Sequence, residues 1–300
     1  MSTTTAPTSV EKTEQDQATG TPPKPRRRGL ATSLVSHGIL IVASVIALFP
    51  VAWLVYLSLG PDSDDYLHPG GIWSKMTFDN YTFVLQHTKF FDWLQTTMIV
   101  TLGTTFIGVI MSATTGYAVS RMRFPGYKKF MWVLLVTQMF PVAVLMVPMY
   151  QILSDLQLVD SYLGLVLVYC TTTVPYCAWL MKGYFDTIPF EIDEAGRVDG
   201  LTPFGTFARL ILPLAKPGLA VAAFYSFLTA FGEVAFASTF MLSDDKYTFA
   251  VGLQTFVSEH DAQRNLMAAT AVLIAIPVAA FFYFVQKNLV TGLTAGGTKG

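Results

Sequence analysis

The sequence predicts an all-α membrane protein with six transmembrane helices. Of its 300 residues, 52% are hydrophobic and only 13% are charged, whereas soluble domains carry about 25% charged residues. Six apolar segments are long enough to cross a hydrocarbon layer of roughly 30 Å, which takes about 20 helical residues. We place these segments near residues 34–59, 91–120, 130–153, 162–181, 219–242 and 266–287.

The first 29 residues have a different composition from the rest of the chain. They are rich in Thr, Pro and Gln, show no apolar periodicity and end in a basic cluster at 24–28, so we expect a disordered tail. The apolar run that follows is too long for a signal peptide and is interpreted as a membrane anchor. Residues 30–90 then form the first transmembrane helix with an outer loop, and 91–289 form the transmembrane core.

The distribution of positive charge predicts the orientation in the membrane. Fifteen of the 19 Lys and Arg residues lie in the N-terminal tail, in 121–129, in 182–217 and at the C-terminus. The segments on the other side of the predicted spans hold the remaining four. Because Lys and Arg accumulate on the cytoplasmic side, we expect both termini and the 182–217 segment to be cytoplasmic. The net charge of −1 indicates no nucleic-acid partner.

Two further features predict how the spans pack. Because lipid provides no hydrophobic force between helices, small residues at every fourth position are needed to let backbones approach. Such stripes occur in the second, fifth and sixth segments: Thr104, Gly108, Ser112 and Gly116; Gly218, Ala222, Ser226 and Ala230; Ala271, Ala275 and Ala279. Prolines within spans predict kinks, at Pro141, Pro148, Pro175 and Pro277.

The stretch from Pro189 to Pro213 is a polar segment between two apolar ones. Pro189 can open a short helix, and Gly200 can close it in a left-handed conformation. Thr202 then supplies an N-cap, and Pro203 the first residue of a second short helix. We expect this charged elbow between two spans to contact something outside the membrane.

Glu233 is the one carboxylate that lies well inside a predicted span. An ionisable group at that depth is costly and usually faces the bundle interior or a water-filled cavity. Its spacing from Ser226 and Ala230 puts it on the small-residue face of the fifth segment. Two interpretations stay open: a residue that lines a substrate or ion path, and a structural carboxylate bonded to a neighbouring helix or close to the outer boundary.

No catalytic signature accompanies this pattern. The sequence has no H-E-x-x-H motif, no G-x-S-x-G motif and no Cys/His spacing typical of a metal site. We therefore expect a protein that is not an enzyme and that needs no cofactor or metal. The last outside loop, 243–265, carries Tyr247, Phe249 and Phe256, which fit either an interfacial aromatic belt or a ligand contact.

Three motifs carry a resemblance to a known family. Glu194-Ala195-Gly196, then Gly200, then Leu210-Ile211-Leu212-Pro213 resemble the E-A-A-x₃-G-x₉-I-x-L-P loop of ABC importer permeases. Gly196 and Leu210 depart from that pattern, which has Ala and Ile there. The segment 247–254 and the ending 289–300 are similar to the smaller permease subunit of maltose/maltodextrin importers (MalG-type), and the resemblance covers about residues 34–300.

The resemblance implies a type I ABC importer permease core of the MetI-like fold in a bacterial plasma (inner) membrane. It implies a non-catalytic subunit for uptake of maltose or maltodextrin by alternating access, with ATP hydrolysed by a separate ATPase dimer. The implied partners are a second homologous permease, that ATPase dimer, an extracytoplasmic sugar-binding protein and membrane lipid. The alternatives are another substrate, such as trehalose or glycerol phosphate, and a proton-coupled secondary transporter that uses Glu233.

The resemblance also implies roles for three groups of residues. The elbow, 186–213, would be the loop that couples to the ATPase, through Glu191, Glu194, Ala195, Gly196, Arg197, Asp199, Gly200, Leu210, Leu212 and Pro213. The cytoplasmic tail, 290–300, would contact the ATPase through Gly296, Gly297, Thr298, Lys299 and Gly300. The outer loop would act as a scoop that enters the site of the binding protein, with Tyr247, Thr248, Phe249, Gly252 and Gln254.

Overall fold

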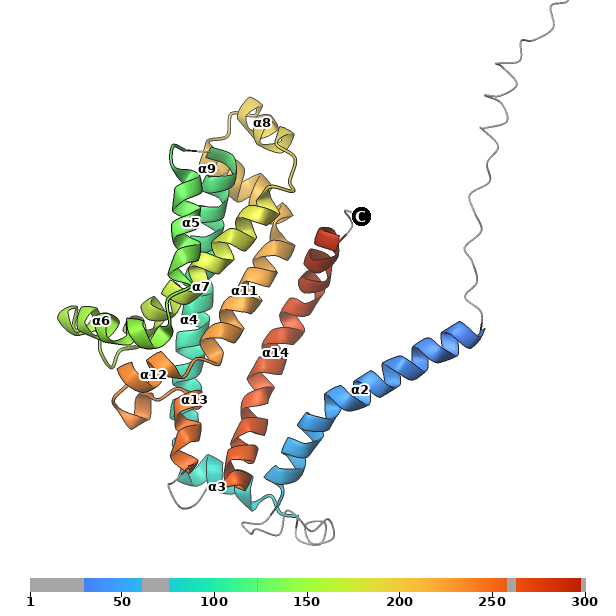
Figure 1. Cartoon of the computed structure of the whole chain (residues 1–300), viewed down its shortest axis with the longest axis vertical. Helices are drawn as coiled ribbons and strands as arrows, with labels where there is room; N and C mark the ends of the chain where they lie inside the picture. Colours follow the sequence, from blue (N-terminus) through green and yellow to red (C-terminus); the bar gives the residue numbers. More distant parts are fainter. Residues whose placement is uncertain (1–29, 61–75, 123, 258–262, 298–300) are drawn as a thin grey trace, which may run out of the picture. The chain divides into compact units, whose positions relative to one another are not determined.

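The computed structural model describes residues 30–60, 76–122, 124–257 and 263–297 (Figure 1), and the side chains of 34–287 within these ranges. The predicted disordered tail, 1–29, and the tail residues Thr298, Lys299 and Gly300 lie outside the described residues. The chain forms two compact units, residues 1–52 and 53–300, and everything discussed below belongs to the second unit except most of the first helix.

All regular elements of the described residues are helices, as predicted. In chain order they are α2 (Leu30–Ser58), α3 (Asp79–His87), α4 (Phe90–Tyr117), the π-helix η2 (Ala118–Met122), α5 (Tyr127–Thr137), α6 (Val142–Asp155), α7 (Tyr162–Phe185), α8 (Glu191–Val198), α9 (Pro203–Thr206), the π-helix η3 (Phe207–Ile211), α10 (Leu212–Leu214), α11 (Lys216–Phe231), α12 (Ala235–Phe240), the 3₁₀ helix η4 (Asp244–Lys246), α13 (Phe249–Gly252), the 3₁₀ helix η5 (Leu253–Phe256) and α14 (Arg264–Gly297).

Four described helices are long and apolar enough to cross a membrane: Leu34–Ser58, Phe90–Met122, Tyr162–Phe185 and Arg264–Lys287. Two bent pairs bring the number to six if each pair is one span. The first pair, α5 and α6, is bent by 103° where Pro141 precedes α6, because the residue before a proline avoids the helical conformation. The predicted span 130–153 is therefore not one continuous helix.

The second pair joins the 203–214 segment to α11 with a bend of 81°. The predicted span 219–242 is also interrupted, since α11 ends at Phe231 and α12 begins only at Ala235. Glu233 lies in this break and not within a continuous helix.

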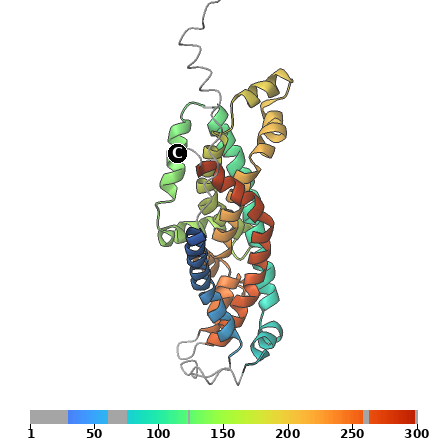
Figure 2. The ribbon, with the colours of Figure 1, turned by 90° about the vertical axis from the view of Figure 1, so that its right-hand side faces the viewer.

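The centre of the second unit consists of α4, α7 and α11, with α14 along α11 (Figures 1 and 2). The stripes of small residues predicted on α4 and α11 are buried in full. At Gly116 a β-carbon would stand 2.8 Å from the backbone nitrogen of Lys182 on α7, and at Gly218 it would stand 2.6 Å from the ring of Tyr184. The stripe predicted on the sixth segment is wrong, because Ala275 and Ala279 are exposed. In its place, Phe281 of α14 stacks on Phe227 of α11, with ring centroids 3.8 Å apart.

Of the segments predicted to be cytoplasmic, residues 182–217 and the C-terminal end of α14 lie at one end of this unit, together with η2 (Figure 1). We call this the elbow end. The opposite end carries α3, α13 and the start of α14. There Asn265 donates a buried 2.9 Å hydrogen bond to Asn80, whose own side-chain amide donates to the carbonyls of Ser58 and Gly60. The predicted tail from residue 290 onward continues as helix α14 through Gly296 and Gly297.

Candidate functional site: the helical elbow

The local structure of the elbow follows the signals in its sequence. Helix α8 begins two residues after Pro189, and Gly200 closes the turn beyond it with a φ of +76°. The hydroxyl oxygen of Thr202 accepts a hydrogen bond from the backbone N–H of Gly205 at 3.1 Å, and Pro203 is the first residue of α9. The predicted helix, glycine turn and second short helix are therefore confirmed. In both ribbon views α8 extends beyond the ends of α7 and α11 (Figures 1 and 2).

The two halves of the elbow pack closely on each other. Gly196 faces α9, and a β-carbon there would lie 2.7 Å from the hydroxyl oxygen of Thr206 and 3.1 Å from a methyl carbon of Leu210. The second half continues as the π-helix η3, a rare geometry often found at functional sites. Leu212 is half-buried and Pro213 is exposed, both at the start of α10.

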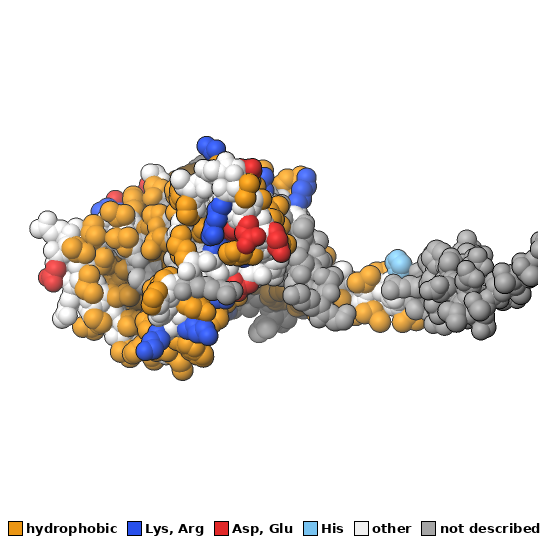
Figure 3. Space-filling view, turned by 90° about the horizontal axis from the view of Figure 1, so that it is seen from above, with side chains coloured by type: hydrophobic (Ala, Val, Ile, Leu, Met, Phe, Trp, Pro, Cys, Tyr) orange, Lys and Arg blue, Asp and Glu red, His pale blue; other side chains and the backbone are white. Residues whose placement is uncertain are grey.

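The outer surface of the elbow combines charged and apolar side chains. Figure 3, seen from the elbow end, shows acidic, basic and hydrophobic groups next to one another. The apolar side chains of the elbow with the highest exposed fractions are Val198 (87%) and Phe204 (72%). The residues of the predicted coupling set that lie on this surface are Glu191, Glu194, Ala195, Arg197, Asp199 and Gly200.

Asp193 is the exception among the acidic residues of α8, because its side chain is only 4% exposed. One carboxylate oxygen lies 3.1 Å from Nε of Arg121 in η2, whose side chain is only 9% exposed. The other accepts a 2.9 Å hydrogen bond from the hydroxyl of Tyr117 at the end of α4. A buried carboxylate must be paired and hydrogen-bonded, and Asp193 is both.

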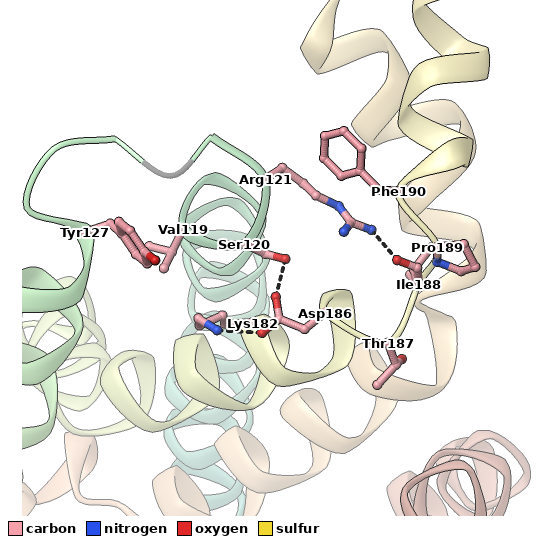
Figure 4. Close-up of a pocket in the computed structure, with 10 residues that line it drawn as sticks. All are labelled: Val119, Ser120, Arg121, Tyr127, Lys182, Asp186, Thr187, Ile188, Pro189 and Phe190. Atoms are coloured by element: carbon pink, nitrogen blue, oxygen red, sulfur yellow. Dashed lines mark hydrogen bonds and ion pairs between the residues drawn. The ribbon is translucent and has the colours of Figure 1, made fainter.

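Arg121 also holds the segment that leads into α8 (Figure 4). It donates a 2.9 Å hydrogen bond to the carbonyl of Ile188, and its guanidinium lies 5.6 Å from the ring centre of Phe190. The guanidinium of Arg197 lies 5.9 Å from the centre of the same ring. Both distances are within the range of cation–π attraction.

A second polar contact joins the same helix ends. The hydroxyl of Ser120 in η2 donates to Asp186 at 2.6 Å, and Lys182 pairs with the other oxygen of Asp186 at 2.5 Å. These residues line a cavity of about 530 Å³ between η2, the end of α7 and the start of the elbow (Figure 4). All of its charged side chains have partners within the protein, so the cavity offers no unpaired charge to a ligand.

The predicted scoop loop lies at the opposite end, and its base is held by Asp160. This carboxylate accepts hydrogen bonds from the backbone of Leu242 and Ser243, from the Ser243 hydroxyl at 2.6 Å and from Lys246 at 2.9 Å. Burial raises the pKa of Asp160, but the hydrogen bonds from Ser243 and Lys246 outweigh it and bring the pKa to about 2. The carboxylate therefore stays ionised and bound at neutral pH.

Most of the residues predicted for the scoop pack inward. Thr248 and Phe249 are buried, and the backbone N–H of Phe249 donates to the hydroxyl of Thr97 at 2.8 Å. Gly252 lies against Trp93, where a β-carbon would be 2.5 Å from the indole. Tyr247 is half-buried and Gln254 is exposed, so of the predicted set these two side chains reach the surface.

Glu233 forms a cap for α12. Its two carboxylate oxygens accept hydrogen bonds from the backbone N–H groups of Phe236 at 2.9 Å and Ala237 at 3.1 Å. A carboxylate at this position also opposes the positive end of the helix dipole. The contacts correspond to the structural interpretation of Glu233, with the carboxylate bound to the next helix.

Arg121 and Tyr117 are functional candidates that sequence reasoning missed. In the sequence, Arg121 was only one of several positive charges after a predicted span, and Tyr117 was part of that apolar span. The one available signal was the position of Arg121 directly after the predicted span 91–120, and the sequence did not separate Asp193 from its acidic neighbours. Among the described residues, no group of three His, Cys, Asp or Glu side chains could hold a metal ion.

The bent spans and the elbow that extends from them define a multi-pass helical membrane protein. Residues 105–294 match the family model described as "Binding-protein-dependent transport system inner membrane component". The chain belongs to this family and is an inner-membrane component of such a system.

Three relatives are similar along most of the chain. The chain is 36% identical to the maltodextrin transport system permease protein MdxG of Bacillus subtilis, over 90% of this chain and 98% of that protein. It is 34% identical to the trehalose transport system permease protein SugB of Mycobacterium tuberculosis, over 85% and 92%. It is 33% identical to the maltose/maltodextrin transport system permease protein MalG of Salmonella typhimurium, over 92% and 99%.

A solved structure shares the fold. It belongs to a bacterial ABC transporter involved in the import of the acidic polysaccharide alginate, and it matches 89% of this chain and 100% of its own chain with a TM-score of 0.72. At 22% sequence identity, this similarity shows the fold alone.

Proposed function

We propose that this chain is a membrane-spanning permease subunit of an ATP-driven importer for maltodextrin-type oligosaccharides. The observation that supports the proposal is the elbow: an exposed, charged α8 whose sequence resembles the coupling loop of ABC importer permeases and which an ion pair holds to the end of the α4 span. The substrate class rests on the three relatives, which are two maltodextrin permeases and a trehalose permease. Trehalose or another oligosaccharide is therefore the alternative substrate.

In this proposal the elbow is a docking helix for a separate ATPase subunit at the cytoplasmic face. Val198 and Phe204 are the exposed apolar anchors, and the charged groups around them form a polar rim, as in other protein interfaces. Glu191 and Glu194 lie in the first turn of α8, where negative charge is favourable. The permease itself hydrolyses nothing, and closure of an ATPase dimer moves the elbow and turns the membrane cavity outward.

The other partners follow from the same assignment. A second homologous permease completes the membrane cavity, and a sugar-binding protein delivers the substrate at the opposite face. There Gln254 and Tyr247 are the predicted scoop residues with surface exposure, while Thr248, Phe249 and Gly252 hold the loop on α4. The C-terminal end of α14 lies at the elbow end, where the tail would reach the ATPase.

Uptake of labelled maltodextrin into vesicles tests this function. Vesicles that contain this chain, the second permease and the ATPase subunit, with binding protein supplied on the substrate side, should accumulate sugar only with ATP. Omission of any one partner should abolish uptake, and excess unlabelled trehalose should compete weakly. Uptake by this chain alone would refute the proposal. Competition by trehalose that is stronger than competition by unlabelled maltodextrin would identify trehalose as the substrate.

A proton-coupled secondary transporter that uses Glu233 is the alternative from another class. Both oxygens of this carboxylate accept hydrogen bonds from backbone N–H groups, which favours the structural role of Glu233 over a proton site. Uptake that collapsed with the proton gradient and did not need ATP would favour this alternative.

A further inference from the structure

Arg121 of the π-helix η2 contacts three separate parts of the elbow region. Its guanidinium lies 3.1 Å from Asp193 on α8, donates to the carbonyl of Ile188 at 2.9 Å and packs on Phe190. Figure 4 shows the side chain directed from η2 toward the segment that enters α8. A single residue therefore links the end of a span to both the entry and the inner face of the elbow.

Burial determines what the ion pair between Arg121 and Asp193 contributes to the structure. The Arg121 and Asp193 side chains are 9% and 4% exposed, so water compensates little of either charge if its partner is lost. Buried ion pairs contribute little net stability compared with apolar residues, but removal of one partner leaves an unpaired buried charge. Such a pair is better suited to fix one relative position of two elements than to stabilise the fold.

The contact continues into the packed interior. Tyr117, which donates to Asp193, also packs on Phe207 with ring centroids 4.7 Å apart and on Phe185 at 5.9 Å. Phe207 belongs to the π-helix η3 in the second half of the elbow, and Phe185 to the end of α7, which leads into the elbow. The Asp193 carboxylate is thus held where three helix ends meet.

No other charged side chain of α8 duplicates this link in the described part of the chain. Glu191, Glu194 and Arg197 are exposed, and Asp193 is the one residue of α8 there with an ion pair to another helix. Asp186 precedes α8 and binds Ser120 and Lys182, which positions the end of α7 but does not contact α8.

We propose that Arg121 and Asp193 are positioning residues that make the elbow and α4 move as one body. The proposal rests on the proposed function, because it assigns the route by which a force on α8 reaches the transmembrane core. Without the pair, α8 could tilt on its two connecting turns while α4 stays in place. ATP hydrolysis would then continue with little sugar transport.

The experiment compares uptake and ATP hydrolysis in the same vesicles, with the fully assembled transporter. The variants are D193N, which keeps the size of the side chain, R121Q, which removes the charge with a shorter polar side chain, and the double variant. Matched controls are D155N and K128Q, which remove one charge at exposed positions. We expect sugar transported per ATP to fall about tenfold in each single variant, with a similar amount of assembled complex and no change in the controls.

The double variant tests whether the two residues act as a unit. Residues in direct contact are non-additive, so the double variant should lose no more than the worse single variant. A wild-type ratio in both single variants, or fully additive losses in the double variant, would overturn the proposal. If a single variant does not assemble, R121K and D193E keep the charge but change the geometry of the contact, and a wild-type ratio in both would overturn the proposal equally.

Hydrogen exchange separates this inference from the proposed function, because it does not depend on the substrate. In D193N and R121Q the amides of α8 should exchange faster than in the wild type, while those of the central part of α7 stay unchanged. Unchanged exchange in α8 would overturn the inference even if the protein transports sugar. Absence of ATP-driven uptake in wild-type vesicles would instead overturn the proposed function and the transport role assigned to the pair.

Discussion

Gly196 of α8 lies so close to Thr206 of α9 that a β-carbon at Gly196 would stand 2.7 Å from the Thr206 hydroxyl oxygen. The position is one of the two departures from the family pattern, which has Ala there. We predict that Gly196→Val reduces uptake strongly, since overpacking costs about 1–3 kcal/mol and separates the two halves of the elbow. Gly196→Ala should have a smaller effect. Addition of Thr206→Ala to the Gly196→Val variant should restore its uptake. Equal uptake by Gly196→Val and the wild type would contradict this packing.

Gly200 allows a second test of the elbow, this time through its backbone. A β-carbon at Gly200 would meet no atom within 4 Å, but the φ of +76° is unfavourable for other residues. This backbone conformation costs most of them about 1–2 kcal/mol. Gly200→Asp, which also adds charge to an exposed turn, should abolish uptake while the protein still inserts into the membrane. Gly200→Asn, which tolerates this conformation better, should keep more activity. Wild-type transport by Gly200→Asp would remove the elbow from the coupling route.

Glu233 distinguishes a helix cap from a proton site. As a cap, Glu233→Gln keeps one acceptor for the backbone N–H groups of α12 and should transport at close to the wild-type rate. Glu233→Ala removes both acceptors and should lower stability by about 1 kcal/mol, as for other N-terminal caps. Thermal unfolding together with uptake measures both effects. Complete loss of uptake in Glu233→Gln with normal stability would favour the proton site instead.

The hydrogen bonds that Asp160 accepts predict a specific pH dependence of stability. The folded pKa of about 2 lies below the ordinary value of 3.8, so ionised Asp160 contributes stability that is fully present above pH 3.8. That contribution is lost as the pH falls from about 4 to about 2. The difference in unfolding midpoint between the wild type and Asp160→Asn should therefore be constant from pH 7 to about 4 and shrink below it. A difference that disappeared already between pH 7 and 5 would show that Asp160 does not make these contacts.

Local signals predicted the elbow well, because its turns depend on few neighbouring residues. Gly200, Thr202 and Pro203 act through backbone geometry and a cap three residues away, and the structure confirms each of these predictions, whereas Pro189 lies two residues before α8 and not at its first position. The small-residue stripes of α4 and α11 were also predictable, since burial of a Gly or Ser on a helix face follows from spacing alone.

The sequence did not reveal features that depend on distant partners. Asp193 could not be separated from its exposed acidic neighbours, because its burial depends on Arg121, 72 positions earlier in the chain. The break at Glu233 was missed because an apolar composition hides the end of one helix and the start of the next. The alanine stripe of α14 does not form its contact with α11. The stacked rings of Phe227 and Phe281 form it instead, and that contact depends on the rotation of both helices about their axes.

Cross-linking from the two ends of the molecule tests the central claim most directly, that the elbow is the contact with the ATPase. Cys170 and Cys177 are buried, so a cysteine introduced at exposed Val198 or Gln254 can carry a photoactivatable group at one site. In the assembled transporter, Val198→Cys should cross-link to the ATPase subunit and Gln254→Cys to the sugar-binding protein. The reverse pattern, or no ATPase product from Val198→Cys in a complex that transports sugar, would contradict the account.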